Sequence, residues 1–268
     1  MILLFDIGNT NTHLGLAKAR RVIHRGNIPT ALWFDGEAKA LLNKLVGPAE
    51  IEAVVLCSVV PRALPHVRKA IRQLWNLTPF ELTAKTLRGL GIDYPRPDTI
   101  GPDRLANALA ARHRFGAPVI VVDFGTAVTF DVVDGAGNYA GGIIAPGLAA
   151  MTEYLHEKTA LLPRIEIREL NTVIGKSTEQ AMLIGAVHGY RGLIRELLLE
   201  LRRELKTHRL PVVATGGCAR LISARLSEIT AVEPNLTLEG LRLVWQAQAG
   251  RLESRPGPSP CNCARRPR

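Results

Sequence analysis

Apolar residues follow two different rhythms along this chain. Unbroken runs of Val, Ile and Leu recur, and between them lie stretches in which apolar residues return every three to four positions. The first rhythm is typical of buried strands and the second of amphipathic helices, so the chain is predicted to have an α/β fold. In the first half the expected order is βββαβαβ, with strands at 2–8, 12–17, 21–28, 51–59 and 79–82 and helices at 34–45 and 62–75.

The second half repeats this order with longer helices. A segment at 84–100 separates the halves and is predicted to be a loop, because its two glycines and two prolines interrupt regular structure. After it we expect strands at 118–124, 127–133, 139–144 and 210–214 and helices at 103–115, 148–155, 178–205, 219–226 and 238–248. A repeated element order on this scale predicts two duplicated halves, residues 1–100 and 101–250.

The repeat is also visible in the residues at the first turn of each half. Asp6-Ile7-Gly8-Asn9-Thr10 and Asp123-Phe124-Gly125-Thr126-Ala127 each place a carboxylate at the end of an apolar strand and a glycine two residues later. Backbone N–H groups at such a turn can hold an anion, and the carboxylate can hold a cation against it. Two such turns on either side of a cleft would hold the phosphates of a nucleotide. The alternative is a pair of ordinary hairpin turns, in which Asp-x-Gly is common.

A third turn has similar potential. The strand expected at 210–214 ends in Thr215-Gly216-Gly217 and leads into a helix. Bare backbone at a helix N-terminus is a place where a base or a ribose can lie. Taken alone, this pattern is equally compatible with a simple strand-to-helix turn.

Charge points to an acidic partner but not to nucleic acid. The chain carries 34 Lys and Arg against 24 Asp and Glu, a net charge of +10. Five arginines and one glutamate lie in residues 251–268, an Arg- and Pro-rich tail that is predicted to be disordered. Elsewhere the excess is scattered, aromatic residues make up only 5% of the chain, and no helix-turn-helix or zinc-finger signature is present. The expected acidic partner is therefore a small molecule.

Neither membrane insertion nor export is expected. The longest uncharged stretch, 135–152, contains five glycines and a proline, and the N-terminus lacks a basic leader with a long apolar core. Four cysteines in such a chain indicate a reduced, cytoplasmic protein, in which Cys57 suits a buried position. Cys261 and Cys263 offer two ligands for a soft metal but lack a second pair, which favours an unliganded tail.

Five motifs occur together in this chain. Besides the three turns they are Gly101-Pro102-Asp103-Arg104 and Gly141-Gly142-Ile143-Ile144-Ala145-Pro146-Gly147. In their order and spacing the five resemble the type III pantothenate kinases over residues 1–248. That family belongs to the acetate and sugar kinase, Hsc70 and actin superfamily, so the resemblance implies two RNase H-like halves around a central nucleotide cleft. It also implies ATP-dependent phosphorylation of pantothenate to 4'-phosphopantothenate, the first step of coenzyme A biosynthesis.

The resemblance assigns roles to individual residues. Asp103 is expected to be the general base; a helix start after a Gly-Pro turn can reach into a cleft, but it also suits a carboxylate that only favours the helix dipole. Arg104 is expected to hold the substrate carboxylate in a two-pronged contact, the alternative being a surface arginine. The other expected substrate contacts are Tyr94, Gly101, Pro102 and Thr178. The expected ATP contacts are Asp6, Ile7, Gly8, Asn9, Thr10, Asn11, Thr12, His13, Thr126, Gly216 and Gly217.

Cations and a second subunit complete what the resemblance implies. Asp123 corresponds to the ligand of a monovalent cation, K⁺ or NH4⁺, and Asp6 is expected to hold Mg²⁺ through water. ATP is expected to bind together with Mg²⁺. The family also implies a homodimer, and the apolar face of the helix at 178–205 can either supply its interface or pack on its own sheet.

The sequence departs from the family pattern in places and leaves two other functions open. His13 follows the first turn, and Lys158 stands where arginine is frequent, but neither removes a group that the chemistry needs. The stretch Gly175-Lys176-Ser177-Thr178 resembles the end of a P-loop, yet Leu170 stands where that motif requires glycine. A protein of this fold can also be an accessory transcriptional regulator, or a kinase of a different small hydroxyl substrate. The presence of both Asp103 and Arg104 favours the pantothenate kinase.

Overall fold

The first half is built on one sheet. The computed structural model describes residues 1–207 and 210–250, so the predicted tail at 251–268, with Cys261 and Cys263, lies outside the described residues. Within the described part, the first sheet has five strands, in the order β3-β2-β1-β4-β5. They are β1 (Ile2–Ile7), β2 (Asn11–Lys18), β3 (Arg21–Pro29), β4 (Ala53–Ser58) and β5 (Phe80–Glu81). Its helices are α1 (Leu32–Asp35), α2 (Ala38–Val46) and α3 (Leu64–Trp75).

The second half is built on a similar sheet with one additional strand. Its order over the described residues is β11-β10-β7-β8-β9-β6. The strands are β6 (Gly91–Ile92), β7 (Val119–Phe124), β8 (Ala127–Val133), β9 (Asn138–Pro146), β10 (Val212–Thr215) and β11 (Ala231–Val232). The helices are α4 (Pro102–Phe115), α5 (Leu148–Lys158), α6 (Thr178–Glu204), α7 (Ala219–Ser223) and α8 (Leu236–Gln248).

The two sheets share one topology. In each, the first three strands form an antiparallel meander, and the fourth strand pairs parallel to the first, with the fifth parallel to the fourth. Strands β7 to β11 therefore repeat β1 to β5, and β6 is added at the free edge of β9. The predicted α/β fold with two duplicated halves is confirmed.

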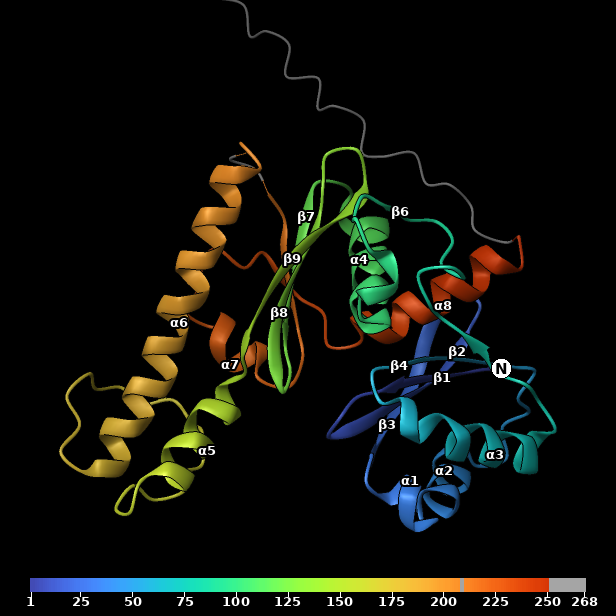
Figure 1. The fold of residues 1–268 in the computed structure, drawn as a ribbon, viewed down its shortest axis with the longest axis horizontal. Coiled ribbons are helices and arrows are strands. Elements are labelled where there is room, and N and C mark those ends of the chain that lie inside the picture. Colours follow the sequence, from blue (N-terminus) through green and yellow to red (C-terminus); the bar gives the residue numbers. More distant parts are fainter. Residues whose placement is uncertain (208–209, 251–268) are drawn as a thin grey trace, which may run out of the picture.

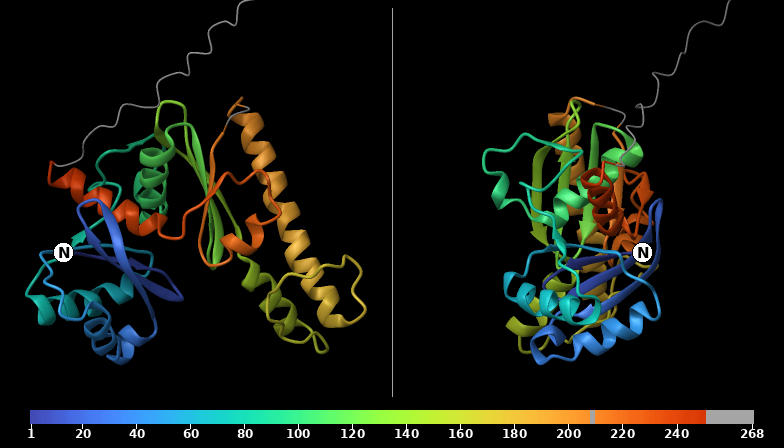
Figure 2. Two further views of the ribbon diagram at one scale, coloured as in Figure 1. Left: turned by 180° about the vertical axis from the view of Figure 1, so that it is seen from behind. Right: turned by 90° about the vertical axis from the view of Figure 1, so that its right-hand side faces the viewer.

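Each sheet separates two apolar cores, because successive side chains in a strand point to opposite faces. Phe5 packs with the helices α1 to α3, whereas its neighbour Leu4 packs with α4 and α8. In the second sheet Val122 faces α6 and α7, and Val121 faces α4 and α8. Helices α4 and α8 thus lie between the sheets (Figure 1), and α6 covers the outer face of the second sheet (Figure 2).

Some predicted elements need correction. The helix at 34–45 is split into α1 and α2, because Gly36 has a left-handed conformation with φ of 81° that ends α1. The segment at 84–100 is not only a loop, since it contains β6 and a 3₁₀ turn at Pro97–Thr99. Strand β11 is missing from the prediction because two residues are too short to show an alternation. Helix α5 continues to Lys158, and α7 already ends at Ser223.

The predicted boundary between the halves at residue 100 stays a prediction. Strand β6 lies before this boundary but pairs with β9 of the second sheet. Helix α8 packs against β1 to β4 of the first sheet as well as against α4. The layer between the sheets therefore joins the two halves into one body.

Candidate active site

The two Asp-x-Gly turns meet between the halves. Asp6 and Asp123 are each the fifth residue of a six-residue strand, β1 and β7, and both lie on the strand face that points towards α4 and α8. Beyond these carboxylates the hydroxyl groups of Thr10 and Thr126 form a hydrogen bond of 3.1 Å. The turns therefore face each other, as the repeat in the sequence indicates.

The first turn is held in shape by a set of polar contacts. The N–H of Gly8 donates to the carbonyl oxygen of Asn11 at 3.0 Å and closes the turn. The hydroxyl of Thr30 donates to the carbonyl oxygen of Gly8 at 2.7 Å, and the indole N–H of Trp33 donates to Thr12 Oγ1 at 2.9 Å. The turn is thus held by contacts from the end of β3 and from α1.

The predicted ATP contacts at 6–13 differ in their surroundings. Ile7 and Thr12 are fully buried, so their side chains belong to the core of the first half. Asn9, Thr10 and His13 are exposed and are available to a ligand. The imidazole of His13 is held by the side chain of Asn27, with 2.8 Å between Nδ1 and Oδ1.

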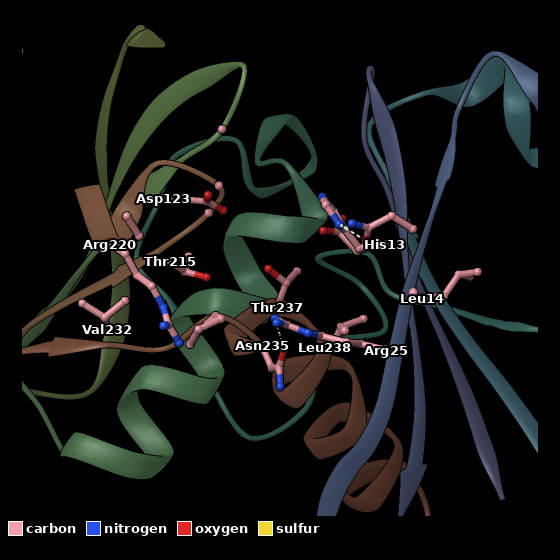
Figure 3. A pocket seen from close by; sticks show the side chains of 18 residues that line it. His13, Leu14, Arg25, Asp123, Thr215, Arg220, Val232, Asn235, Thr237 and Leu238 are labelled. Atoms are coloured by element: carbon pink, nitrogen blue, oxygen red, sulfur yellow. Dashed lines mark hydrogen bonds between the residues drawn. The ribbon is translucent and has the colours of Figure 1, made fainter. Parts of the chain in front are cut away.

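A cavity of about 580 Å³ lies between the halves and is lined from both sides. Of the predicted ATP and cation residues, Asp6, His13, Asp123, Gly216 and Gly217 line it. Figure 3 shows His13, Leu14 and Arg25 of the first half opposite Asp123, Thr215, Arg220 and Val232 of the second, with Asn235, Thr237 and Leu238 between them. The Thr215-Gly216-Gly217 turn therefore opens into the same cavity as the two Asp-x-Gly turns.

Several lining residues are absent from the sequence-based prediction. Arg25 donates through Nη1 to the side chain of Asn235 at 3.2 Å, which joins β3 to the start of α8. Arg25 and Asn27 alternate along β3, and β3 pairs Asn27 with His13 of β2. The polar residues on one face of β3 are visible in the sequence, but only the pairing of β3 with β2 shows that this face borders the cavity. The other lining residues that the prediction lacks are Leu14, Gly26, Ala219, Arg220, Val232, Pro234, Thr237 and Leu238, whereas Gly125 and Thr215 belong to the predicted turns.

Asp103 brings a third carboxylate to the two turns. It lies in the first turn of α4, directly after the Gly101-Pro102 start of the helix, and α4 begins between the two sheets. Burial raises the pKa of Asp103, and the backbone N–H of Arg104, which donates to Asp103 Oδ1 at 2.9 Å, opposes that rise. Asp103 does not line the cavity, but its negative charge raises the pKa of both Asp6 and Asp123, so the three carboxylates lie near one another beside the two turns.

The carboxylate of the first turn has a strongly shifted pKa. Burial, reinforced by the negative charges of Asp103 and Asp123, raises the pKa of Asp6 to about 8. The opposing contact is weak, because the donor is the thiol of Cys57, with 3.5 Å between Sγ and Asp6 Oδ1. Asp6 lies opposite Cys57 in the parallel pairing of β1 and β4. Without a cation, Asp6 therefore tends to keep a proton near neutral pH.

The carboxylate of the second turn has a stronger partner. Burial raises the pKa of Asp123 to about 6, while a hydrogen bond of 2.9 Å from the side-chain amide of Asn107 limits the rise. That amide is held in turn by the hydroxyl of Thr237, which donates to Asn107 Oδ1 at 2.8 Å. Asp123 is therefore ionised over a wider pH range than Asp6.

The carboxylates suit a hard cation better than a preformed metal centre. Among the described residues, no group of three or more His, Cys, Asp or Glu side chains is arranged to hold a metal ion. Burial raises the pKa of Asp6 and of Asp123, the negative charge of Asp103 adds to both shifts, and a cation or cationic ligand that enters would relieve this repulsion. Carboxylate oxygens are the donors that Mg²⁺ and other hard cations prefer. The residues present thus fit cations that arrive with a ligand.

The expected substrate residues Tyr94 and Arg104 lie together on the second half. The side chain of Arg104 donates from Nε to Asp131 Oδ1 at 2.5 Å and from Nη2 to the carbonyl oxygen of Phe130 at 3.0 Å. Its guanidinium carbon lies 5.9 Å from the ring centre of Tyr139, and the ring of Tyr94 contacts the same tyrosine edge to face at 6.3 Å. Arg104 directly follows Asp103 in α4, and Tyr94 shares the neighbour Tyr139 with Arg104.

Thr178 is not brought to this place. It begins α6, on the other face of the second sheet from α4. There it lines a second, apolar cavity of about 770 Å³ between α5 and α6. Within one chain, Thr178 and Asp103 therefore belong to different surfaces.

Solved structures of other proteins share this fold. The chain is similar to a structure described as a Baf family transcriptional activator from Campylobacter jejuni, with a TM-score of 0.59 and 17% identity over 92% of this chain and 99% of that one. It is also similar to a ROK family glucokinase from Streptomyces griseus, with a TM-score of 0.50 and 14% identity over 92% and 98% of the two chains. At these identities the likeness shows the fold alone, which is that of actin-like ATPases and sugar kinases.

Sequence relatives identify the family to which the chain belongs. The family model of type III pantothenate kinases matches residues 2–200. The type III pantothenate kinase of Akkermansia muciniphila is 46% identical over 243 residues, 90% of this chain and 96% of that protein. The protein of the same name from Methylacidiphilum infernorum is 42% identical over 247 residues, 91% and 88% of the two chains. The chain therefore belongs to the type III pantothenate kinase family and is a phosphotransferase.

Proposed function

We propose that this enzyme transfers the γ-phosphoryl group of ATP to the terminal hydroxyl group of pantothenate, the first step of coenzyme A biosynthesis. The observation that carries the proposal is that Asp103 lies close enough to Asp6 and Asp123, the carboxylates of the two facing turns, to raise the pKa of both, in a chain of this family. Phosphoryl transfer requires mainly positioning and electrostatic stabilisation, together with one residue that orients the attacking hydroxyl.

Asp103 is the proposed general base. A carboxylate that accepts the proton of an alcohol works best when its pKa lies above the ordinary carboxyl range, and burial raises the pKa of Asp103 in that direction. The N–H of Arg104 holds one carboxylate oxygen at 2.9 Å and so orients the group. The proton would pass from the hydroxyl group to Asp103 as the hydroxyl oxygen bonds to the γ-phosphorus and the bond from that phosphorus to the bridging oxygen breaks, so that ADP leaves.

The two turns are proposed to hold the phosphates of ATP from both sides. Backbone N–H groups and the exposed side chains of Asn9, Thr10, His13 and Thr126 are donors, and the Gly216-Gly217 turn borders the cavity where the nucleoside would lie. Asp6 would hold Mg²⁺ through water and Asp123 a monovalent cation. Magnesium bound with ATP supplies charge neutralisation on the phosphates.

Arg104 is proposed to hold the carboxylate of pantothenate, with Tyr94 beside it. The Nη hydrogens that Asp131 and Phe130 do not use would make this contact. Thr178 does not reach this place in its own chain, and the predicted homodimer would let Thr178 of one subunit approach the site of the other.

The test is an ADP-release assay with purified protein, ATP, Mg²⁺ and K⁺. We expect turnover with pantothenate and none above background with a panel of sugars, and the product should show one phosphate on the terminal oxygen by mass spectrometry. Turnover with a sugar but not with pantothenate would show that the protein is a kinase with a different substrate. Absence of turnover with every acceptor, together with DNA binding that persists at physiological salt, would instead support the regulator.

A further inference from the structure

The strongest feature that the proposed function leaves unexplained is a buried acidic residue behind Arg104. Asp131 lies in the middle of β8, and its side chain has no exposed surface. The side chain of Arg104 is 14% exposed, so the pair has an inner, acidic end and an outer, basic end. A buried ion pair of this kind contributes little to stability compared with apolar residues of the same size, which points to a role in placing the arginine.

Asp131 is itself held in place by its neighbours. The hydroxyl of Tyr139 donates to Asp131 Oδ1 at 3.2 Å, and the hydroxyl of Thr129 donates to Oδ2 at 3.4 Å. These two hydroxyl donors orient the carboxylate of Asp131. The Nε of Arg104 lies 2.5 Å from its Oδ1. The ring of Tyr139 also lies under the guanidinium group, which adds an attraction between cation and aromatic ring.

Strand β9 has glycines, and so no side chains, where the guanidinium group of Arg104 crosses it. A Cβ atom at Gly142 would lie 2.7 Å from Arg104 Nη2 and would also collide with the carbonyl oxygen of Phe130, which accepts from that nitrogen. At Gly141, where φ is 123°, a Cβ atom would lie 3.6 Å from the ring of Tyr94. The two glycines thus open space for both expected substrate residues.

We propose that Asp131, with Tyr139 behind it and Gly142 beside it, is a positioning residue that holds Arg104 as a receptor for a carboxylate and thereby makes the enzyme select an acidic acceptor. The inference rests on the proposed function, in which Arg104 contacts the acceptor. Asp131 holds the Nε edge of the Arg104 guanidinium group inward, so that only the remaining Nη hydrogens face the substrate. Because the N–H of the same arginine also holds Asp103, the arrangement sets the distance between the carboxylate receptor and the general base.

The first test compares Asp131→Asn with the matched control Asp134→Asn. Asp134 lies just past the end of β8, away from Arg104, and its carboxylate accepts a hydrogen bond of 2.9 Å from the backbone N–H of Asn138. In Asp131→Asn we expect KM for pantothenate to rise about tenfold or more, because a charge-assisted contact is lost. The KM for ATP should stay within about twofold, since no ATP group depends on this contact. The control should leave both KM values unchanged.

A second measurement tests selectivity directly. The inhibition constants of pantothenate analogues with a carboxylate and with an amide in its place should differ in the wild-type enzyme, and this difference should shrink in Asp131→Asn. Tyr139→Phe removes only one hydroxyl, so it remains informative if Asp131→Asn does not fold. In that variant we expect a severalfold rise in KM for pantothenate at an unchanged melting temperature.

The outcomes separate the inference from the proposed function. A wild-type enzyme without turnover of pantothenate would overturn the proposed function. A wild-type enzyme with turnover, but with KM values for ATP and pantothenate that move together in Asp131→Asn or do not move in either variant, would overturn the inference alone. A rise in KM for pantothenate without a rise in KM for ATP supports the inference, since a merely structural role would not distinguish the two substrates.

Discussion

The two duplicated halves present the same carboxylate in different surroundings. Asp6 and Asp123 occupy equivalent positions of β1 and β7, yet the pKa of Asp6 is raised to about 8 and that of Asp123 to about 6. The first faces a thiol of the neighbouring strand at 3.5 Å, and the second accepts a hydrogen bond of 2.9 Å from the amide of Asn107. Duplication thus supplies a symmetric frame, and single neighbouring residues make the two halves of the site chemically unequal.

The difference follows from what covers each sheet. Helix α4 lies between the halves but begins near both turns, and its residue Asn107 reaches only the second carboxylate. The first carboxylate meets the parallel strand β4 instead, where Cys57 is fully buried. The pKa of Asp123 therefore lies below that of Asp6, and a cation that enters between the turns would lower both.

The largest effect is expected when the negative charge of Asp103, which acts on the carboxylates of both turns, is removed. Asp103 raises the pKa of both Asp6 and Asp123 and is the proposed base. In Asp103→Asn we expect kcat to fall by about 10²–10⁴-fold, the usual contribution of a general base. The coupled assay measures it, with Asp35→Asn on the exposed surface of α1 as the control.

The melting temperature of Asp103→Asn should equal or exceed that of the wild type, because a half-buried carboxylate with a raised pKa is lost. A loss of activity that accompanies unfolding would not support the role of Asp103. Full activity in a folded variant would remove Asp103 from the mechanism.

A second, smaller effect is expected when the two carboxylates are made alike. Asn107→Ala removes the amide that limits the rise in the pKa of Asp123, so this pKa should move up towards that of Asp6. The acidic limb of the profile of kcat/KM against pH should then shift to higher pH. Loss of a buried hydrogen bond should also lower the free energy of unfolding by about 1–3 kcal/mol.

The matched control for this variant is Asn43→Ala, at an exposed position of α2. An acidic limb that stays in place, despite the loss of stability, would show that Asn107 has only a structural role. A shift in the control as well would point to an effect on the whole protein.

A third effect concerns stability and pH in the absence of ligands. The folded-state pKa values of Asp6 and Asp123, about 8 and about 6, lie above the ordinary value of 3.8, so the folded state binds more protons than the unfolded state. The free energy of unfolding therefore falls as pH rises from about 4 to about 8.

Thermal unfolding at pH 6 and pH 8 measures this effect. We expect a higher melting temperature at pH 6, by a few degrees, since one kcal/mol corresponds to ~2–4 °C in a chain of this size. Between these pH values Asp6→Asn should flatten the slope more than Asp123→Asn, because Asp6 titrates higher. Equal slopes in both variants would contradict the difference between the two turns.

The smallest effect is expected from the neighbour of the first carboxylate. Cys57→Ser replaces a weak thiol donor by a hydroxyl, so the pKa of Asp6 should fall towards that of Asp123. The change in melting temperature between pH 6 and pH 8 should become smaller. Cys218→Ser, at the half-buried start of α7, is the matched control and should leave that change as it is. An enlarged pH dependence in Cys57→Ser would reverse the assigned role of the thiol.

The element order was predictable because it depends on local patterns. Apolar runs and helical spacing locate most strands and helices, and the paired Asp-x-Gly turns indicate the duplication without any structure. Strand β11 and the pairing of β6 could not be predicted, because two residues carry no periodicity and their partners are distant in the sequence. The same reason hides Arg25 and Asn235, which meet only when β3 lies beside α8.

The sequence by itself determined the α/β fold, the duplicated halves and the residue types that can bind phosphate and cations. Only the tertiary structure decided which of these residues meet. It places Asp103 with both turns, Asp131 behind Arg104, and Thr178 on the other face of the second sheet. The physical reason is that secondary structure follows from local side-chain patterns, whereas burial, hydrogen bonding and pKa depend on side chains that are distant in the sequence.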